Sequence, residues 1–465
     1  MLKQNSFLGN SFIYIVGVAL NQGINFLLLV IFLPSVLSPD DYALVALYSL
    51  WVNVCLSFIS LQSASSVNNA LVEHGESKLN SYLFSISLLS VFASIITILI
   101  VLIFNNSIES IIGFPTFFVI LIIVQAGISS FAALQLEKNR VLKKAFPAVA
   151  WSSSIPVLRI CLSVALVLFV FKSNYLGDIY GFSIAAILIG LVAFAKTAYD
   201  AKLKFNFNYI KFALPITVPI IFHSISNLIL TGTDKVMLYQ MLGRSEMGIY
   251  SFIFNISILP TGLWFAINNS WSVEYFEKLI NNDIDSIKTL TNTYIKFIFC
   301  VYVLVLLVLP EVIYIIAPPE YFSGVTYASF IMAGGFFTFL YTICSVHQIY
   351  AKKTIYIPTA TVISAVLNIG LNLLFIPRYG AFGAAISSVI SFFILFMMHY
   401  IFSKFVIGGF PIEFKRLVIP GALVACLSLF VNLLIDFMIT RLLLATVFGV
   451  FFMFSFVRYL RKSNG

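Results

Sequence analysis

Residues 232–250 read GTDKVMLYQMLGRSEMGIY and place an adjacent acid and base, Asp234 and Lys235, inside an apolar span that ends in a short polar turn. Charged side chains inside a membrane span are costly unless they face water, another charge or a ligand. The apolar runs before and after the turn are each long enough to cross a bilayer. The pattern therefore predicts a transmembrane hairpin with charge in the protein interior.

The composition extends this reading to the whole chain. Of the 465 residues, 61% are hydrophobic and 10% are charged, and the mean hydropathy is +1.03. Soluble domains carry about 25% charged residues, so a soluble fold is excluded. Fourteen stretches approach the length of about 20 residues that a spanning helix needs. They are 11–36, 43–64, 80–104, 111–134, 146–171, 175–196, 212–242, 246–270, 293–316, 323–349, 355–376, 381–403, 417–436 and 439–458. Barrel strands would be about half as long, with alternating polarity, so we expect an all-α integral membrane protein.

The basic residues predict the orientation. If both termini are cytoplasmic, 21 of the 27 lysines and arginines fall in or beside the cytoplasmic connections and only four beside the outer ones. This asymmetry follows the positive-inside rule and predicts a multi-pass membrane protein with both termini in the cytoplasm. It also accounts for the net charge of +9 without nucleic acid as a partner. The scattered histidines, the lack of CxxC pairs and the lack of HExxH, P-loop or GxSxG motifs predict no metal site and no enzyme.

The chain repeats itself at an interval of about 205 residues. LSPDDYAL (37–44) resembles LGRSEMGI (242–249), and VLRICLS (157–163) parallels VLNIGLN (366–372). Six spans per repeat give both copies the same orientation and predict two pseudo-symmetric six-helix lobes with a site at mid-membrane. The predicted parts are an N-lobe at 1–196, a cytoplasmic linker at 197–211, a C-lobe at 212–404, and two further spans at 405–465.

Polar side chains form one stripe on each of the first two helices of each repeat, because helix residues at i, i+4, i+7 and i+11 share a face. Lipid offers these groups no partner, so they face the bundle interior, either lining a cavity or joining helices as hydrogen-bond glue. The stripes contain Asn10, Tyr14, Asn21 and Asn25; Asn53, Ser57 and Ser60; His223, Asn227, Thr231 and Asp234; and Ser251, Asn255 and Asn269.

Three ionisable residues stand out within the spans. Arg159 lies near the middle of the fifth span, where it is expected either to hold an anionic substrate or to pair with a neighbouring helix. Asp234 is expected either to bind a coupling proton or cation or to pair with Arg159. His223 is expected either to titrate near neutral pH or to be a hydrogen-bonded structural residue.

The repeat motifs also resemble a known family. LSPDDYAL (37–44), DKVML (234–238) and above all LNIGLNLLFIPRYGAFGAA (367–385) are similar to bacterial polysaccharide-export flippases, the Wzx-type translocases of O-antigen or capsule repeat units. The resemblance spans nearly the whole chain. This family belongs to a superfamily that also holds multidrug (MATE) antiporters and the lipid II flippase, and the resemblance implies the two-lobed fold of that group.

The resemblance implies that the membrane is the bacterial inner membrane and that the chain moves an undecaprenyl-pyrophosphate-linked oligosaccharide from its inner to its outer leaflet by alternating access. Arg159 and Lys235 would contact the pyrophosphate, and the sugar would contact Asn21, Asn25, Asn53, Asn227, Asn255 and Asn368. No cofactor is expected, although Asp234 and His223 are candidates for coupling to a proton or sodium gradient. Membrane lipids and the polymerase and chain-length machinery of polysaccharide assembly are expected partners. The alternatives are a lipid II flippase, a cation-coupled drug antiporter and a membrane enzyme such as a polymerase.

Overall fold

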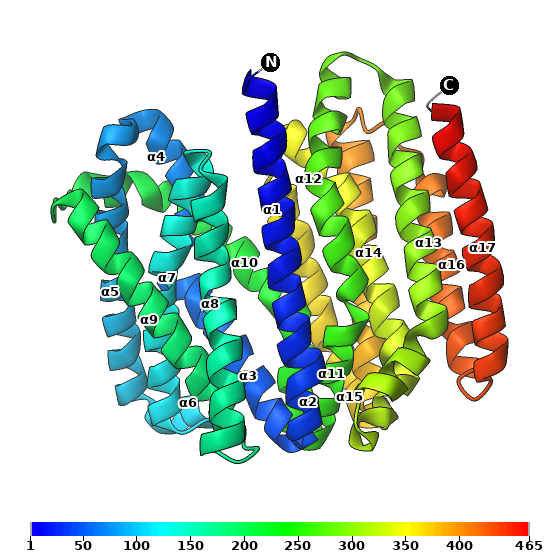
Figure 1. The fold of residues 1–465 in the computed structure, drawn as a ribbon, viewed down its shortest axis with the longest axis horizontal. Helices are drawn as coiled ribbons and strands as arrows, with labels where there is room; N and C mark the ends of the chain where they lie inside the picture. Colours follow the sequence, from blue (N-terminus) through cyan, green and yellow to red (C-terminus); the bar gives the residue numbers. More distant parts are fainter. Residues whose placement is uncertain (1, 464–465) are drawn as a thin grey trace. The chain divides into compact units, whose positions relative to one another are not determined.

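The computed structural model describes residues 2–463 and is helical almost throughout, with no β-strand among them (Figure 1). The helices that form the spans are α1 (Leu2–Phe26), α3 (Pro39–Ile59), α5 (Glu76–Ile103), α7 (Thr116–Val141), α8 (Ala145–Ala165), α9 (Leu176–Ala201), α10 (Phe207–Leu242), α11 (Arg244–Ser257), α12 (Leu259–Ile280), α13 (Ile284–Ile316), α14 (Val325–Tyr350), α15 (Tyr356–Ile401), α16 (Phe414–Leu433) and α17 (Met438–Ser463). Shorter helices are α2 (Leu33–Val36), α4 (Val67–His74) and α6 (Asn105–Ile112).

The spans agree with the predicted all-α membrane fold. Twelve helical segments among the described residues are long and apolar enough to cross a membrane. One of them, 356–407, covers two of the predicted spans. The two are separated by a sharp kink in α15 at Gly380, where φ is 61° and ψ is −142°. A residue with a side chain rarely adopts this conformation, whereas glycine does so readily. The fourteenth predicted span falls on α17, whose shorter apolar part is 438–454.

The residues divide into two compact units. The first unit comprises 1–37 and 41–228, and the second comprises 38–40 and 229–465. The division falls inside α10, between Leu228 and Ile229, and the segment 197–211 is the end of α9, a short turn and the first residues of α10.

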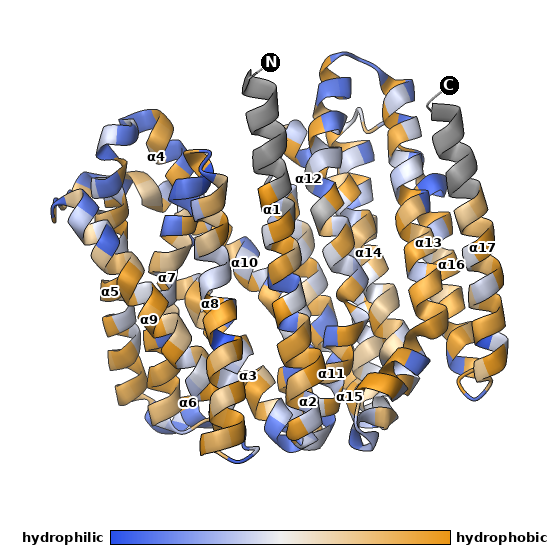
Figure 2. Cartoon of the chain, viewed as in Figure 1, coloured by the Kyte–Doolittle hydropathy of each residue, from blue (hydrophilic) through white to orange (hydrophobic). Residues whose placement is uncertain are grey.

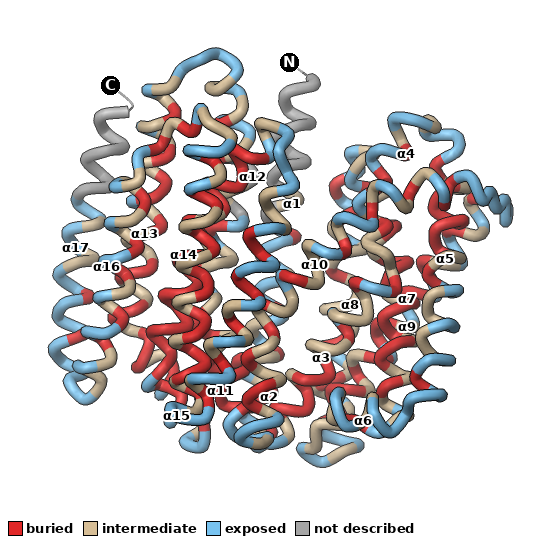
Figure 3. Tube along the Cα trace, turned by 180° about the vertical axis from the view of Figure 1, so that it is seen from behind, coloured by how far each residue is buried: buried red, intermediate tan, exposed pale blue. Residues whose placement is uncertain are grey.

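Hydrophobic residues predominate along the long helices, as a bilayer requires (Figure 2). In the first unit, Phe92, Leu99 and Ile103 project from α5 and are more than half exposed. In the second unit, α14 is buried along nearly its whole length and packs against α13, α15 and α16 (Figure 3). Lipid-facing apolar residues and a buried central helix are typical of polytopic bundles.

The two hairpins that carry the repeat begin at matching positions. Helix α3 begins at Pro39 and α11 begins at Arg244, which reproduces the offset of 205 residues in the sequence motifs. In the first copy, the chain enters the turn through a π-helical segment at Leu27–Phe32 and through α2. In the second copy, α10 continues regularly up to Leu242.

Candidate functional site

A polar pocket lies within the first unit, between the end of α3, α7 and the first part of α10. Its volume is about 300 Å³. The polar residues that line it are Asn53, Ser57, Ser60, Gln62, Ser63, Ser130, Ser224 and Asn227, and the apolar ones are Leu56, Ala64, Ala133 and Leu228. We call this cavity the α3–α10 pocket. Its lining contains two of the predicted asparagines, Asn53 and Asn227, and no charged residue.

The chain forms the α3–α10 pocket by an abrupt end of α3. Helix α3 ends at Ile59, and Leu61 and Gln62 then both adopt the left-handed conformation, with φ 50° each. For residues with a side chain this costs about 1–2 kcal/mol each. The turn directs the Gln62 amide to Ser224 on α10, to whose hydroxyl it donates a hydrogen bond of 3.0 Å. Strained backbone of this kind is often found at functional sites.

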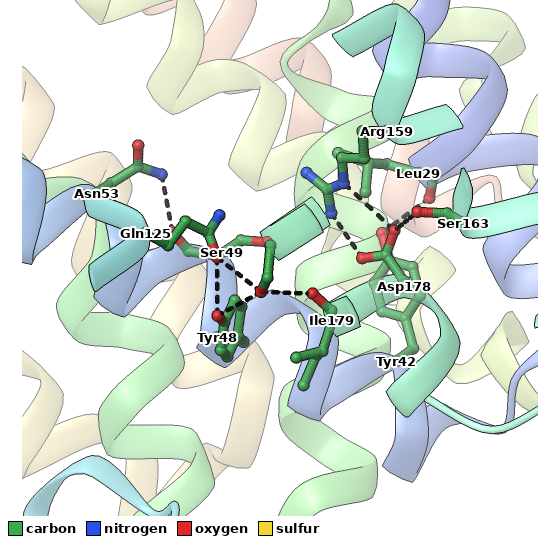
Figure 4. Close-up of polar contacts among 11 residues, drawn as sticks. Leu29, Tyr42, Tyr48, Ser49, Asn53, Gln125, Arg159, Ser163, Asp178 and Ile179 are labelled. Atoms are coloured by element: carbon green, nitrogen blue, oxygen red, sulfur yellow. Dashed lines mark hydrogen bonds and ion pairs between the residues drawn. The ribbon is translucent and has the colours of Figure 1, made fainter. Parts of the chain in front are cut away.

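Hydrogen bonds between α3 and α10 connect the walls of the pocket. The hydroxyls of Ser57 and Ser224 are 3.2 Å apart. The amide of Asn53 donates back to the Ser49 carbonyl of its own helix at 2.9 Å (Figure 4). Ser63 is only 2% exposed, and its hydroxyl has no hydrogen-bond partner among the described side chains and backbone groups. The pocket thus contains both satisfied and unsatisfied polar groups.

Arg159 forms a buried ion pair with Asp178 of α9 (Figure 4). The guanidinium donates to both carboxylate oxygens, Nη2 to Oδ2 at 2.7 Å and Nε to Oδ1 at 3.2 Å, and the hydroxyl of Ser163 adds a bond of 2.7 Å to Oδ1. The guanidinium also lies 4.0 Å from the centre of the Phe182 ring. Arg159 is 7% exposed and Asp178 is 1% exposed. This is the helix-pairing arrangement that the sequence left open, with Asp178 as the partner.

Close approach of α8 and α9 makes this contact possible. A Cβ at Gly181 would lie 2.6 Å from the Ser163 hydroxyl and 2.7 Å from its backbone nitrogen. Only glycine therefore lets the two helices come together at this level. A second network lies nearby, where the hydroxyls of Tyr48 and Ser183 and the Gln125 carbonyl oxygen are within 2.9 Å of one another. Buried polar contacts thus connect α8 to α9, and α3 to α7 and α9, within the first unit.

Asp234 lies in a buried cluster of neutral donors in the second unit. Its Oδ1 accepts a 2.7 Å bond from the Asn372 amide, and its Oδ2 accepts a 2.8 Å bond from the Tyr250 hydroxyl and a further bond from Ser388. Asp234 is 2% exposed, and it forms no ion pair with any of the side chains that the structure describes. A buried carboxylate without a cation is costly unless it is protonated or binds an ion.

Asn368 extends the Asp234 cluster by one helical turn. Its Oδ1 accepts a 3.1 Å hydrogen bond from Asn372, and both residues are fully buried in α15. The Asn368 amide nitrogen and the Asn372 carbonyl oxygen have no partner among the described groups. The cluster therefore has unused hydrogen-bonding capacity next to the carboxylate.

Lys235 lies against an aromatic ring of α11. Its Nζ lies 4.4 Å from the centre of the Phe254 ring, and the part of the chain that the structure describes contains no carboxylate in ion-pair contact with it. The neighbouring residue Asn255 is partly buried on the same helix as Phe254. Lys235 thus differs from Arg159, which is held in an ion pair.

Three other predicted residues, Asn21, Asn25 and His223, lie in the first unit. Asn21 donates a 3.4 Å bond to Ser152 of α8, Asn25 is exposed, and His223 is partly buried with an unsatisfied Nδ1. The side chains of Asn10 and Asn269 lie outside the described part of the structure. The substrate and coupling roles assigned to all these residues stay predictions.

Several residues of these networks were not among the predicted site residues, namely Gln62, Asp178, Ser224, Tyr250, Asn372 and Ser388. The sequence could have indicated Asn372, because it lies four residues after Asn368 and therefore on the same helix face. It could also have indicated Asp178, because Asp178 is the one acidic residue of the fifth and sixth predicted spans. Gln62, Ser224 and Ser388 gave no such signal, because single hydroxyls and amides are common in membrane helices.

The comparisons with known proteins agree with this architecture. The sequence profile of the family described as "Polysaccharide biosynthesis protein" matches residues 7–273. No curated protein matches the sequence. The fold is similar to the lipid II flippase MurJ in an inward closed conformation, with a TM-score of 0.68 and 15% identity over 97% of this chain and 99% of that one.

Two further solved structures share the fold. An inward-facing multidrug resistance MATE transporter gives a TM-score of 0.63 at 14% identity, over 84% of this chain and 94% of that one. A MOP superfamily transporter from Pyrococcus furiosus gives 0.61 at 14% identity, over 86% and 95%. At such identities the likeness concerns the fold alone. The protein is a multi-pass membrane protein with the fold of MOP superfamily transporters. Since the family profile covers more than half of the sequence, the chain belongs to the polysaccharide biosynthesis protein family.

Proposed function

We propose that the protein is a flippase that moves undecaprenyl-pyrophosphate-linked oligosaccharide repeat units, of O-antigen, capsule or a related polysaccharide, from the inner to the outer leaflet of the plasma membrane. The observation that carries the proposal is the α3–α10 pocket, an uncharged cavity of hydroxyls and amides inside an apolar bundle. Oligosaccharides need such donors and acceptors to replace water, and the prenyl chain can stay in the bilayer. Membership of the family supports the same substrate class.

Lys235 is the stronger candidate for the pyrophosphate. A pyrophosphate in a membrane cavity needs a cation that is not already neutralised. Arg159 is occupied by both oxygens of Asp178, whereas Lys235 contacts only an aromatic ring among the described side chains. In this proposal Lys235 holds the phosphates, and Arg159 clamps α8 to α9 with Asp178 as its permanent partner.

The Asp234 cluster is the proposed coupling site. A proton on Asp234 is accommodated if either the Tyr250 or the Ser388 hydroxyl rotates from donor to acceptor. A sodium ion would instead use the carboxylate together with the amide oxygens of Asn368 and Asn372, since hard cations prefer oxygen ligands. Either event changes the charge of a site shared by α10, α11 and α15 and can bias two arrangements of these helices. His223 is an alternative proton site, with an unsatisfied ring nitrogen.

The test is genetic and then biochemical. Deletion of the gene is expected to abolish the surface polysaccharide and to accumulate the lipid-linked unit in the inner leaflet, and the intact gene is expected to restore both. Normal surface polysaccharide in the deletion strain contradicts the proposal. If peptidoglycan synthesis or drug susceptibility changes instead, the lipid II flippase or the drug antiporter takes its place.

A further inference from the structure

We propose that the α3–α10 pocket is a carbohydrate subsite that selects uncharged sugar units, with Gln62 as its specificity-determining residue. The inference rests on the proposed function and adds the chemical class of sugar. It is carried by the lining of the pocket, by an unpartnered buried hydroxyl and by the strained turn that places Gln62.

The lining is chemically uniform. All eight polar residues that face the pocket are neutral serine, asparagine or glutamine side chains. Each sugar hydroxyl both donates and accepts, and serine hydroxyls and amides do the same. A uronic acid or an amino sugar would instead bring a charge into a cavity with no opposite charge among its lining residues, which is costly inside a membrane protein.

The Ser63 hydroxyl has an unused hydrogen-bonding capacity at the pocket. Ser63 is one of the residues that line the pocket, and its buried hydroxyl makes no hydrogen bond to any described group. Most buried hydroxyls in folded proteins are satisfied. A ligand hydroxyl in the pocket would supply the missing bond.

Gln62 connects the two walls of the pocket. The backbone of Gln62, like that of Leu61 before it, adopts the left-handed conformation. The amide nitrogen of the Gln62 side chain donates a hydrogen bond to the Ser224 hydroxyl. That hydroxyl is in turn within 3.2 Å of Ser57. The Gln62 amide oxygen is left to accept from a ligand, so a single uncharged side chain joins α3, α10 and the cavity.

The experiment uses the full-length protein in lipid nanodiscs and saturation-transfer NMR. The probes are methyl α-glucoside, methyl α-galactoside and N-acetylglucosamine as neutral sugars, and glucuronate and glucosamine as charged ones. We expect saturation transfer to the neutral probes and much weaker transfer to the charged ones. Equal transfer to neutral and charged probes, or none to the neutral ones, overturns the proposal.

Variants locate the signal. Gln62→Leu and Ser224→Val are expected to weaken binding of the neutral probes about five- to tenfold, as for the loss of one or two ligand hydrogen bonds. Ser226→Ala on the same helix and Ser129→Ala beside Ser130 lie outside the pocket lining and are expected to bind normally. Unchanged binding in both pocket variants overturns the proposal.

Gln62→Glu tests specificity directly, because it keeps the shape of the side chain and adds a charge. It is expected to raise glucosamine binding above that of the glucoside, a reversal that a merely structural role would not produce.

Transport of a lipid-linked oligosaccharide in vesicles is measured separately. If transport occurs but sugar binding is independent of Gln62, this inference fails and the proposed function stands. If binding follows Gln62 but no lipid-linked sugar is moved, the proposed function fails.

Discussion

Ser163 and Asn372 lie 209 residues apart at corresponding positions of the two repeats, and each donates a 2.7 Å hydrogen bond to a buried carboxylate. In the first unit the carboxylate is Asp178, and Arg159 neutralises it. In the second unit it is Asp234, and its hydrogen-bond donors among the described residues, Tyr250, Asn372 and Ser388, are all neutral. The two repeats thus share a polar side chain that binds a buried carboxylate. The carboxylate is neutralised by an arginine in the first copy and surrounded by neutral donors in the second.

The Arg159–Asp178 pair is expected to stabilise the first unit. Asp178→Asn leaves a buried guanidinium without its counter-charge, a change that costs about 3–5 kcal/mol in proteins. We expect a lower thermal unfolding midpoint in detergent and a shorter lifetime of the folded protein. Asp200→Asn is the matched control, because Asp200 pairs with Lys138 and Lys196 at a partly exposed site worth about 1 kcal/mol or less. Equal stability of the two variants would show that the buried pair contributes nothing.

Acid is expected to weaken one contact outside the membrane spans. Glu109 of α6 accepts hydrogen bonds from the side chain and the backbone of Thr116, at the start of α7. These bonds lower the pKa of the Glu109 carboxyl below its usual 4.5. A lowered folded-state pKa means that the stabilisation is complete above 4.5 and is lost as the pH falls through the folded value.

The measurement compares Thr116→Val with the unchanged protein across this pH range. The difference in unfolding midpoint is expected to be largest at neutral pH and to shrink below about 4.5. Thr97→Val is the control, because Thr97 bonds only a backbone carbonyl of its own helix. A pH-independent effect of Thr116→Val would argue that the carboxylate is not the acceptor that matters.

Much of the fold follows from the sequence because hydrocarbon leaves the backbone few choices. The lengths of the apolar runs predicted the helices, and the repeat predicted that α3 and α11 begin 205 residues apart. The apolar runs predicted the end of one span at 376 and the start of the next at 381, and the backbone leaves the helical conformation between them, at Gly380.

The partners of the charged residues were harder to predict. Periodicity placed Asp234 on an inward face, but the choice between Arg159 and neutral donors depends on how helices distant in sequence pack. Asp178 lies near the end of its span, where a carboxylate is equally compatible with an interfacial position. The bend at Leu61 and Gln62 has no glycine or proline to signal it, so neither the α3–α10 pocket nor its Gln62–Ser224 bond was predictable from the sequence.

Lys235 is expected to contribute to binding of the lipid-linked substrate. Lys235→Gln removes the charge but keeps a hydrogen-bonding side chain, and hydrogen bonds to charged groups are worth about 1.5–3 kcal/mol. We expect affinity for an undecaprenyl-pyrophosphate probe to fall about tenfold or more, with a weaker salt dependence. Lys211→Gln on the same helix is the control, since Lys211 also lies over an aromatic ring, 5.3 Å from the centre of Phe207. Equal losses in both variants would indicate a general effect of positive charge.

Asp234 is expected to couple transport to an ion gradient without being needed for the fold. In Asp234→Asn the amide oxygen still accepts bonds from the Tyr250 and Ser388 hydroxyls, and the new amide nitrogen can donate to Asn372 once the Asn372 amide turns its unpartnered oxygen toward it. We therefore expect the variant to insert and to bind substrate normally. Transport in vesicles is expected to lose its response to an imposed proton or sodium gradient, because the site can no longer change its charge. Asp285→Asn in α13, an exposed position, keeps the response. Separate proton and sodium gradients identify the ion, and the same gradient response in Asp234→Asn and the unchanged protein would move the search to His223.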